Sequence, residues 1–121
     1  NYTRADASLG PLIVNGYAYT PTSSQAFTAT PTFDCALSNA FEFSGAMTAN
    51  VTSVTLSNAH AGQTISIRVK QDATGSRTVA APSGAKILGS VGSTASTASC
   101  LTLQYSAMDS RWEGSWTPYP A

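Results

Sequence analysis

The most regular alternation of apolar and polar residues runs from residue 64 to residue 71. Apolar side chains stand at every second position from Ile65 to Val69, and the positions between them are polar, among them Arg68 and Lys70. A period of two is typical of a strand with one buried face and one exposed face. The pattern therefore predicts a strand with an aliphatic inner face and a basic outer face.

A turn and a return strand are predicted directly after this strand. Residues 72–75 suit a turn, because Asp72 can accept hydrogen bonds from the nearby backbone and Gly75 tolerates a positive φ. Residues 77–81 then extend back, and the Pro-Ser-Gly sequence at 82–84 ends the strand. We therefore expect residues 63–84 to form a β-hairpin.

Shorter stretches with the same alternation follow one another from residue 32 to residue 116. The expected strands are residues 32–37, 40–44, 51–57, 85–88, 100–106 and 111–116. Their predicted inward side chains are Phe33, Cys35, Leu37, Phe41, Phe43, Val54, Leu56, Leu101, Leu103, Tyr105 and Trp112. No stretch has the period of an amphipathic helix, and no segment recurs at a fixed period, which argues against a solenoid or a propeller. Short strands separated by turns predict an all-β fold, a single antiparallel β-sandwich that is jelly-roll-like.

Residues 1–32 differ from residues 33–121, which we assign to the β-sandwich domain. Residues 20–31 are mainly Thr, Ser and Ala, with Pro21 and Pro31 near the ends, and prolines keep a segment extended and out of central strands. We therefore expect an extended N-terminal arm, or edge strands joined by linkers. An arm of this kind can lie on a neighbouring subunit or on its own domain, and the sequence leaves both open.

The charge of the chain is low and balanced. Charged residues make up 10% of the sequence, the formal net charge is zero, and the six Lys and Arg residues are scattered. Nucleic acids are bound by clustered Lys and Arg, so the composition argues against a nucleic-acid partner. No apolar run is long enough to span a membrane, so no membrane partner is expected. A surface of small, uncharged residues with a net charge near zero instead favours association with copies of the same chain.

Residue types that carry catalysis or bind metals are few. His60 is the only histidine, whereas a metal site needs three or four ligands, so we expect no metal and no cofactor. A glycosidase needs two facing carboxylates, and Asp34 with Glu42, on neighbouring predicted strands, is the one pair that fits. We nevertheless expect no catalytic residue and no enzyme activity. Cys35 and Cys100 fit either free buried thiols or a disulfide, and the sequence leaves this open.

Several side chains are candidates for an interface or a binding surface. Arg68 and Lys70 share the outer strand face, which fits a solvated face or a subunit contact. Trp116 and Tyr119 fit a subunit contact or a platform for a sugar ring, because each combines an apolar ring with a polar group. The candidate interface or binding residues are Arg68, Lys70, Arg77, Trp116 and Tyr119.

A family resemblance rests on the segments around the predicted hairpin. The sequence VKQDATGSRTV at 69–79 is followed by PSGAK at 82–86, preceded by VTLSN at 54–58, and closed by the predicted strands within 101–112. This layout resembles a β domain of virion proteins from tailed bacteriophages and prophages, including tail-fibre and other tail-associated proteins. The resemblance covers about residues 33–116.

The resemblance implies a non-enzymatic structural protein located in the phage virion. It implies association with copies of the same chain, often as a homotrimer, and binding to other virion proteins. A capsid-decorating protein of the head surface and a tail-fibre component both fit, and the sequence leaves head and tail open. The alternative is a module at a fibre tip that binds host-surface glycans, which rests on the Tyr and Trp residues and on the polar loops of small residues.

Overall fold

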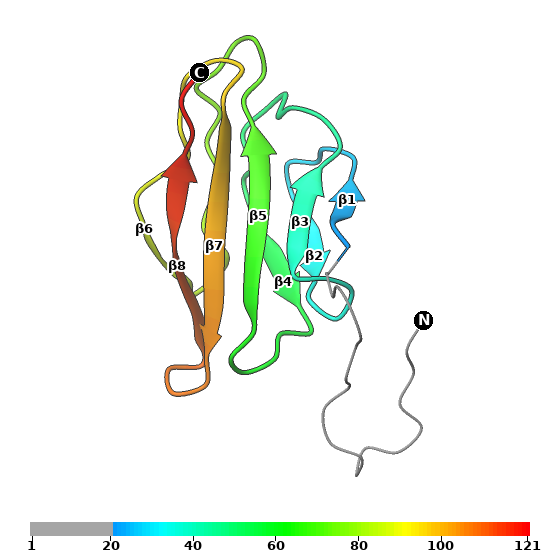
Figure 1. Cartoon of the computed structure of the whole chain (residues 1–121), viewed down its shortest axis with the longest axis vertical. Helices are drawn as coiled ribbons and strands as arrows, with labels where there is room; N and C mark the ends of the chain where they lie inside the picture. The colour runs from blue at the N-terminus through cyan, green and yellow to red at the C-terminus, as the bar shows by residue number, and fades with distance from the viewer. Residues whose placement is uncertain (1–20) are drawn as a thin grey trace, which may run out of the picture.

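The computed structural model describes residues 21–121, and this part of the chain forms eight β-strands and no helix (Figure 1). The strands are β1 (Ser23–Gln25), β2 (Thr32–Asp34), β3 (Ala40–Phe43), β4 (Thr55–Ser57), β5 (Thr64–Lys70), β6 (Lys86–Leu88), β7 (Ala98–Ser106) and β8 (Arg111–Pro118). They form a six-stranded sheet in the order β1-β3-β5-β7-β8-β6 and a two-stranded sheet of β2 and β4. The all-β prediction is therefore confirmed. None of the described residues belongs to a helix that is long and apolar enough to cross a membrane.

Strand directions in these sheets are mixed, so the predicted purely antiparallel sandwich is wrong. β1, β3 and β5 pair in parallel, as do β2 with β4 and β6 with β8, whereas β7 is antiparallel to both β5 and β8. β1 and β8 consequently run in the same direction. Parallel neighbours cannot be joined by a tight turn, and here the chain crosses to the small sheet between β1 and β3 and again between β3 and β5 (Figure 1). The jelly-roll-like connectivity is not confirmed.

This winding is closer to a short β-solenoid than to a clear sandwich. β1, β3 and β5 are successive passes through the large sheet, with β2 and β4 as the passes through the small sheet between them. An isolated parallel bridge joins Val51, before β4, to Val79, on the pass that follows β5. Ser23 pairs with Phe41, and Phe41 pairs with Ile67, so successive coils differ in length. Unequal coils explain why the sequence shows no fixed period and why a solenoid was not expected.

Most of the predicted N-terminal arm, residues 1–20, lies outside the described residues. The part that is described contains β1, which forms one edge of the large sheet, and Thr32, the first residue of β2. The division into an arm at 1–32 and a domain at 33–121 stays a prediction.

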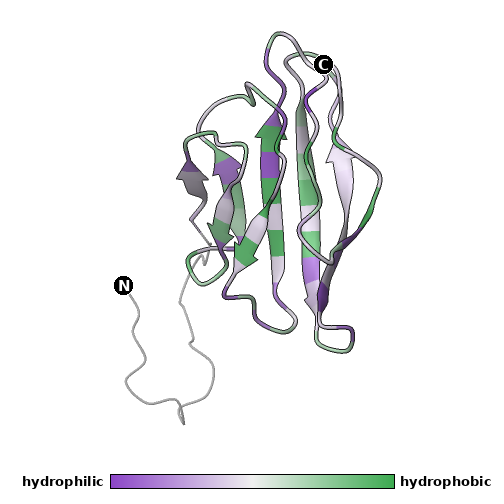
Figure 2. Cartoon of the chain, turned by 180° about the vertical axis from the view of Figure 1, so that it is seen from behind, coloured by the Kyte–Doolittle hydropathy of each residue, from purple (hydrophilic) through white to green (hydrophobic). Residues whose placement is uncertain are grey.

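The core lies between the two sheets and contains most of the side chains predicted to face inward. Burial alternates along β5 as expected, with the apolar side chains from Ile65 to Val69 buried. The hydropathy of the residues alternates along the same strand (Figure 2). Aromatic rings join the sheets, since the ring centroid of Phe33 on β2 is 5.2 Å from that of Phe41 on β3. The buried apolar residues are Phe33, Cys35, Phe41, Phe43, Met47, Val51, Val54, Ile65, Ile67, Val69, Leu101, Leu103 and Trp112. Removing these side chains from water is the main favourable contribution to folding.

Two expectations about local structure are wrong. Leu37 is 73% exposed, because β2 ends at Asp34 and the Leu37 N–H donates to the Asp34 carbonyl oxygen at 3.0 Å in a turn. Residues 63–84 do not form a hairpin, because β5 pairs with β3 and β7, and residues 77–81 contribute only the bridge at Val79. An antiparallel hairpin instead joins β7 to β8 through residues 107–110.

Candidate functional site

The sequence motif after β5 forms a loop, residues 71–79, that is closed by the side chain of Gln71. This side chain is 1% exposed. Its Nε2 donates to the carbonyl oxygens of Arg77, at 2.8 Å, and Gly92, at 2.7 Å, and its Oε1 accepts from the Arg77 N–H at 2.9 Å. A buried amide is tolerated when both of its ends are paired. These bonds take the place of strand pairing at Arg77, which is why the predicted return strand is absent.

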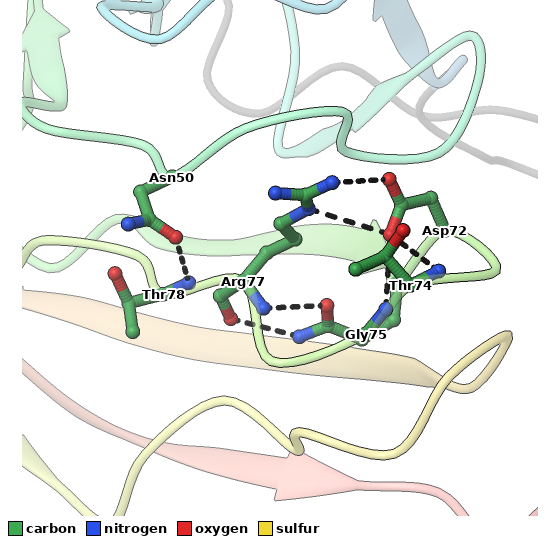
Figure 3. A network of polar contacts seen from close by, with 7 residues as sticks. Asn50, Asp72, Thr74, Gly75, Arg77 and Thr78 are labelled. Carbon is green, nitrogen blue, oxygen red and sulfur yellow. Dashed lines mark hydrogen bonds and ion pairs between the residues drawn. The ribbon is translucent and has the colours of Figure 1, made fainter.

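An ion pair between Asp72 and Arg77 fixes the same loop (Figure 3). Arg77 Nη2 donates to Asp72 Oδ2 at 2.8 Å, and the backbone N–H groups of Thr74 and Gly75 donate to Asp72 Oδ1 at 3.2 and 3.0 Å. The hydrogen bond from Arg77 is the main reason that the pKa of Asp72 lies below its ordinary value. The same bond raises the pKa of Arg77. Arg77 is therefore engaged within the loop.

Gly75 lets this loop pack against the segment before β7. Its φ is +73°, and an added Cβ would lie 2.8 Å from the Ser93 carbonyl oxygen and 2.9 Å from the Ala95 nitrogen. The Ser76 N–H donates to that Ser93 oxygen at 2.8 Å. Residues with side chains rarely adopt such a φ, so this position requires Gly. The residues of the motif on which the family resemblance rests therefore form and stabilise this loop.

Three of the five candidate binding residues gather on the outer face of the large sheet. Arg68 and Lys70 project from β5, and the Arg68 Cζ lies 5.4 Å from the centroid of the Tyr119 ring. Tyr119 reaches this place because its backbone N–H donates to the Ala98 carbonyl oxygen at 2.9 Å, beside β7. A guanidinium over an aromatic face is an attractive cation–π contact. Tyr119 remains 44% exposed, so the pair is open to solvent.

A shallow groove of about 680 Å³ borders Arg68. Its lining comes from β1, β3, β5 and the loops that follow β3 and β5, and includes Ser96 from the segment before β7. Glu42 stands in register with Arg68 on the neighbouring strand, but no ion pair joins them. Six lining side chains make no hydrogen bond or ion pair with another of residues 21–121: Ser24, Glu42, Ser44, Arg68, Lys70 and Ser96. The groove therefore offers a set of polar groups without partners among these residues.

Trp116 lies on the other side of the sheet from Arg68. It pairs with Leu101 across β7 and β8, and its half-buried ring packs against the core. Its exposed part borders a second groove, of about 460 Å³, together with Arg77. The structure thus separates Trp116 from the cluster of Arg68, Lys70 and Tyr119, whereas Arg77 is paired with Asp72, which lines the groove beside Arg68.

The carboxylate pair proposed for hydrolysis does not form. Asp34 is on the small sheet and Glu42 on the large one, and the neighbouring Phe33 and Phe41 pack against each other between the sheets. The two carboxylates therefore point away from the core on opposite faces. A hydrogen bond from Asn58 Nδ2 to Asp34 Oδ1, at 2.8 Å, is the main cause that lowers the pKa of Asp34.

Other reactive side chains are also dispersed within residues 21–121. His60 is exposed in a loop, and no three His, Cys, Asp or Glu residues in this part of the chain could hold one metal ion together. Cys35 and Cys100 are both free thiols. Burial raises the pKa of the Cys35 thiol, which makes it a poor nucleophile.

Gln71 and the groove were not expected from the sequence. Gln71 continues the inward positions of β5 after Val69, and a polar residue at an inward position signals a buried amide with fixed partners. The groove has no comparable signal, because Ser24, Glu42 and Ser96 come from three distant segments.

These features define an all-β domain. Within residues 21–121 its surface has polar and aromatic side chains that can bind a ligand, and no group of side chains arranged for catalysis. Residues 19–110 match the family model described as "Putative phage tail fibre C-terminal domain". The match covers more than half of the chain, and the chain belongs to this family of phage tail fibre domains. It is therefore a component of the phage virion, as the resemblance implied. Comparison with curated proteins and with solved structures gave no match.

Proposed function

We propose that this domain is a non-enzymatic structural part of a tail fibre that works by associating with copies of itself and with other virion proteins. A homotrimer is the expected form. Membership of the tail fibre family supports the tail over the head, which the sequence left open.

The outer face of the large sheet carries this proposal. Ser66, Thr102 and Ser115 stand side by side on β5, β7 and β8, and Leu88, which is 76% exposed, extends the row on β6. Within this row the short hydroxyl side chains leave no charge to be desolvated, so a second surface can cover the row at low cost. An exposed apolar side chain at the edge adds a favourable contact.

Sedimentation velocity tests the association. We expect the purified chain to form an oligomer, and Thr102→Glu, which places a charge in the middle of this face, to shift it toward monomer. Thr55→Glu, on an exposed position of the small sheet, is the matched control and should leave the oligomer unchanged. A compact monomer at every concentration that also fails to bind other virion proteins would contradict the proposal.

A second candidate function is recognition of a host-surface saccharide. One observation favours it: the exposed Tyr119 ring contacts Arg68, and Arg68 lines a polar groove. Aromatic rings and polar groups in a groove are the usual means of holding a sugar. A glycan array with the wild type, Tyr119→Ala and Trp116→Ala tests this function. Loss of signal only in Tyr119→Ala would support the groove, and loss only in Trp116→Ala would place the saccharide on the opposite side.

A further inference from the structure

We propose that the groove beside Arg68 binds the anionic group of an acidic saccharide, with Arg68 as the anion-binding residue and Tyr119 as the residue that positions it. This inference rests on saccharide recognition, the second function above. It adds the chemical class of the ligand and a separate role for each side chain.

The contact with Tyr119 prepares Arg68 to bind an anion. The backbone of Tyr119 is held where its N–H donates to the Ala98 carbonyl oxygen, and the Arg68 guanidinium lies over the Tyr119 ring at 5.4 Å from its centroid. A guanidinium donates hydrogen bonds at its edge, so stacking on a ring leaves its N–H groups free to form a bidentate contact with a carboxylate or a phosphate. A side chain that is already ordered loses less conformational entropy when the ligand binds.

The charges around the groove also favour an anion. Within residues 21–121, Arg77 and Arg111 are paired with carboxylates, whereas Arg68, Lys70 and Lys86 are not. Two of these three unpaired cations, Arg68 and Lys70, border the groove. Asp72 also borders it but is neutralised by Arg77, so Glu42 is the one unpaired carboxylate in the lining. The unpaired charges therefore sum to a net positive site, which attracts a single anionic group.

The remaining groups in the groove suit the hydroxyls of a sugar. Glu42 can accept hydrogen bonds only, while the hydroxyl groups of Ser24, Ser44 and Ser96 can both donate and accept. A sugar ring presents hydroxyls that need both kinds of partner. The groove volume of about 680 Å³ is in the range of sites that hold small molecules. A free inorganic anion would use the two cations and leave these four groups without a role.

Titration followed by nuclear magnetic resonance of the full chain tests the proposal. The probes are glucuronic acid, glucose 6-phosphate and glucose, which share a ring and differ in the anionic group. We expect shifts of the Arg68 side-chain Nε–H and the Lys70 amide with an acidic probe, and much smaller shifts with glucose. A response to only one acidic probe identifies the group as carboxylate or phosphate. The absence of any shift at Arg68 with both acidic probes would overturn the inference.

Two substitutions test whether binding of the acidic probe depends on Arg68 itself or only on the net charge of the domain. Arg68→Gln should weaken binding of the acidic probe at least about tenfold, because a charge-assisted contact is lost. Lys86→Gln removes one positive charge away from this groove and should leave the affinity unchanged; an equal loss in this variant would overturn the proposal. Tyr119→Phe keeps the ring and should retain binding, whereas Tyr119→Leu should weaken it. Equal affinities in Tyr119→Phe and Tyr119→Leu would overturn the positioning role.

The outcomes also distinguish the acidic ligand from saccharide recognition in general. A neutral glycan that binds the wild type and Arg68→Gln equally on an array would leave saccharide recognition standing while overturning the acidic ligand. No binding of any glycan, neutral or acidic, would overturn both.

Discussion

Replacing Gln71 with Leu removes a buried amide that holds the loop at residues 71–79. The change leaves the Arg77 N–H, the Arg77 carbonyl and the Gly92 carbonyl without their partner. A hydrogen bond in a folded protein contributes roughly 0.5–1.5 kcal/mol, and an unpaired buried group costs about 1–3 kcal/mol. Arg77 and Gly92 are partly exposed, so water can reach some of these groups. We therefore expect the free energy of unfolding to fall by about 3 kcal/mol, near the sum of three net hydrogen bonds.

Urea denaturation measures this loss, and thermal denaturation should show a midpoint lower by about 10 °C for a domain of this size. Gln104→Leu is the matched control, because Gln104 is exposed on β7 and its side chain has no hydrogen-bond partner within residues 21–121. It should change the free energy of unfolding by less than about 0.5 kcal/mol. A Gln71→Leu variant as stable as Gln104→Leu would contradict this prediction, because it would mean that the buried amide does not hold the loop.

Three further predictions concern other parts of the domain. Gly114→Ala should lower the free energy of unfolding by about 3 kcal/mol in urea denaturation, because the added Cβ would meet the Thr102 carbonyl oxygen and lie 2.9 Å from Leu103 Cδ2. Gly45→Ala is the control and should be nearly neutral, because nothing lies within 4 Å of its added Cβ. Equal effects of the two substitutions would contradict the close packing at Gly114. Asp72 has a lowered folded-state pKa, so its stabilising contribution is complete above its unfolded-state pKa and is lost as the pH falls below about 4. The difference in stability between the wild type and Asp72→Asn should therefore shrink in acid, and a constant difference from pH 7 to pH 3 would count against the ion pair. A thiol reagent should modify the half-exposed Cys100 in the native protein and leave the buried Cys35 intact until unfolding, and equal rates would contradict the burial of Cys35.

Local structure was predictable where it depends on the residues of a single strand. The alternation in β5 and β7 gave the inward side chains, and Trp112 faces the core as its position indicates. Alternation has the same period in parallel and antiparallel sheets, so it does not reveal strand direction. The wrong prediction of an antiparallel return strand at residues 77–81 has this origin. The segment around Val79 has the alternation of a strand, but Val79 forms a parallel bridge with the distant Val51.

The candidate site was predictable only residue by residue. Arg68 and Lys70 could be placed together because they share one strand face. Tyr119 joins them because the chain after β8 continues beside Ala98 of β7, a long-range pairing that no local pattern encodes. Trp116 has the same residue chemistry as a sugar platform, but its register with Leu101 turns the ring toward the core.

The common direction of β1 and β8 has a mechanical consequence for a fibre. The described chain enters the large sheet at one end of the strands through β1 and leaves it at the other end through β8 (Figure 1). Tension between these two ends runs along the strands, so it strains the hydrogen bonds between neighbours in shear. The bonds between two strands are then loaded together, whereas a pull across the strands would open them one at a time. This path therefore favours resistance to a pull along the strands over resistance to a pull across them.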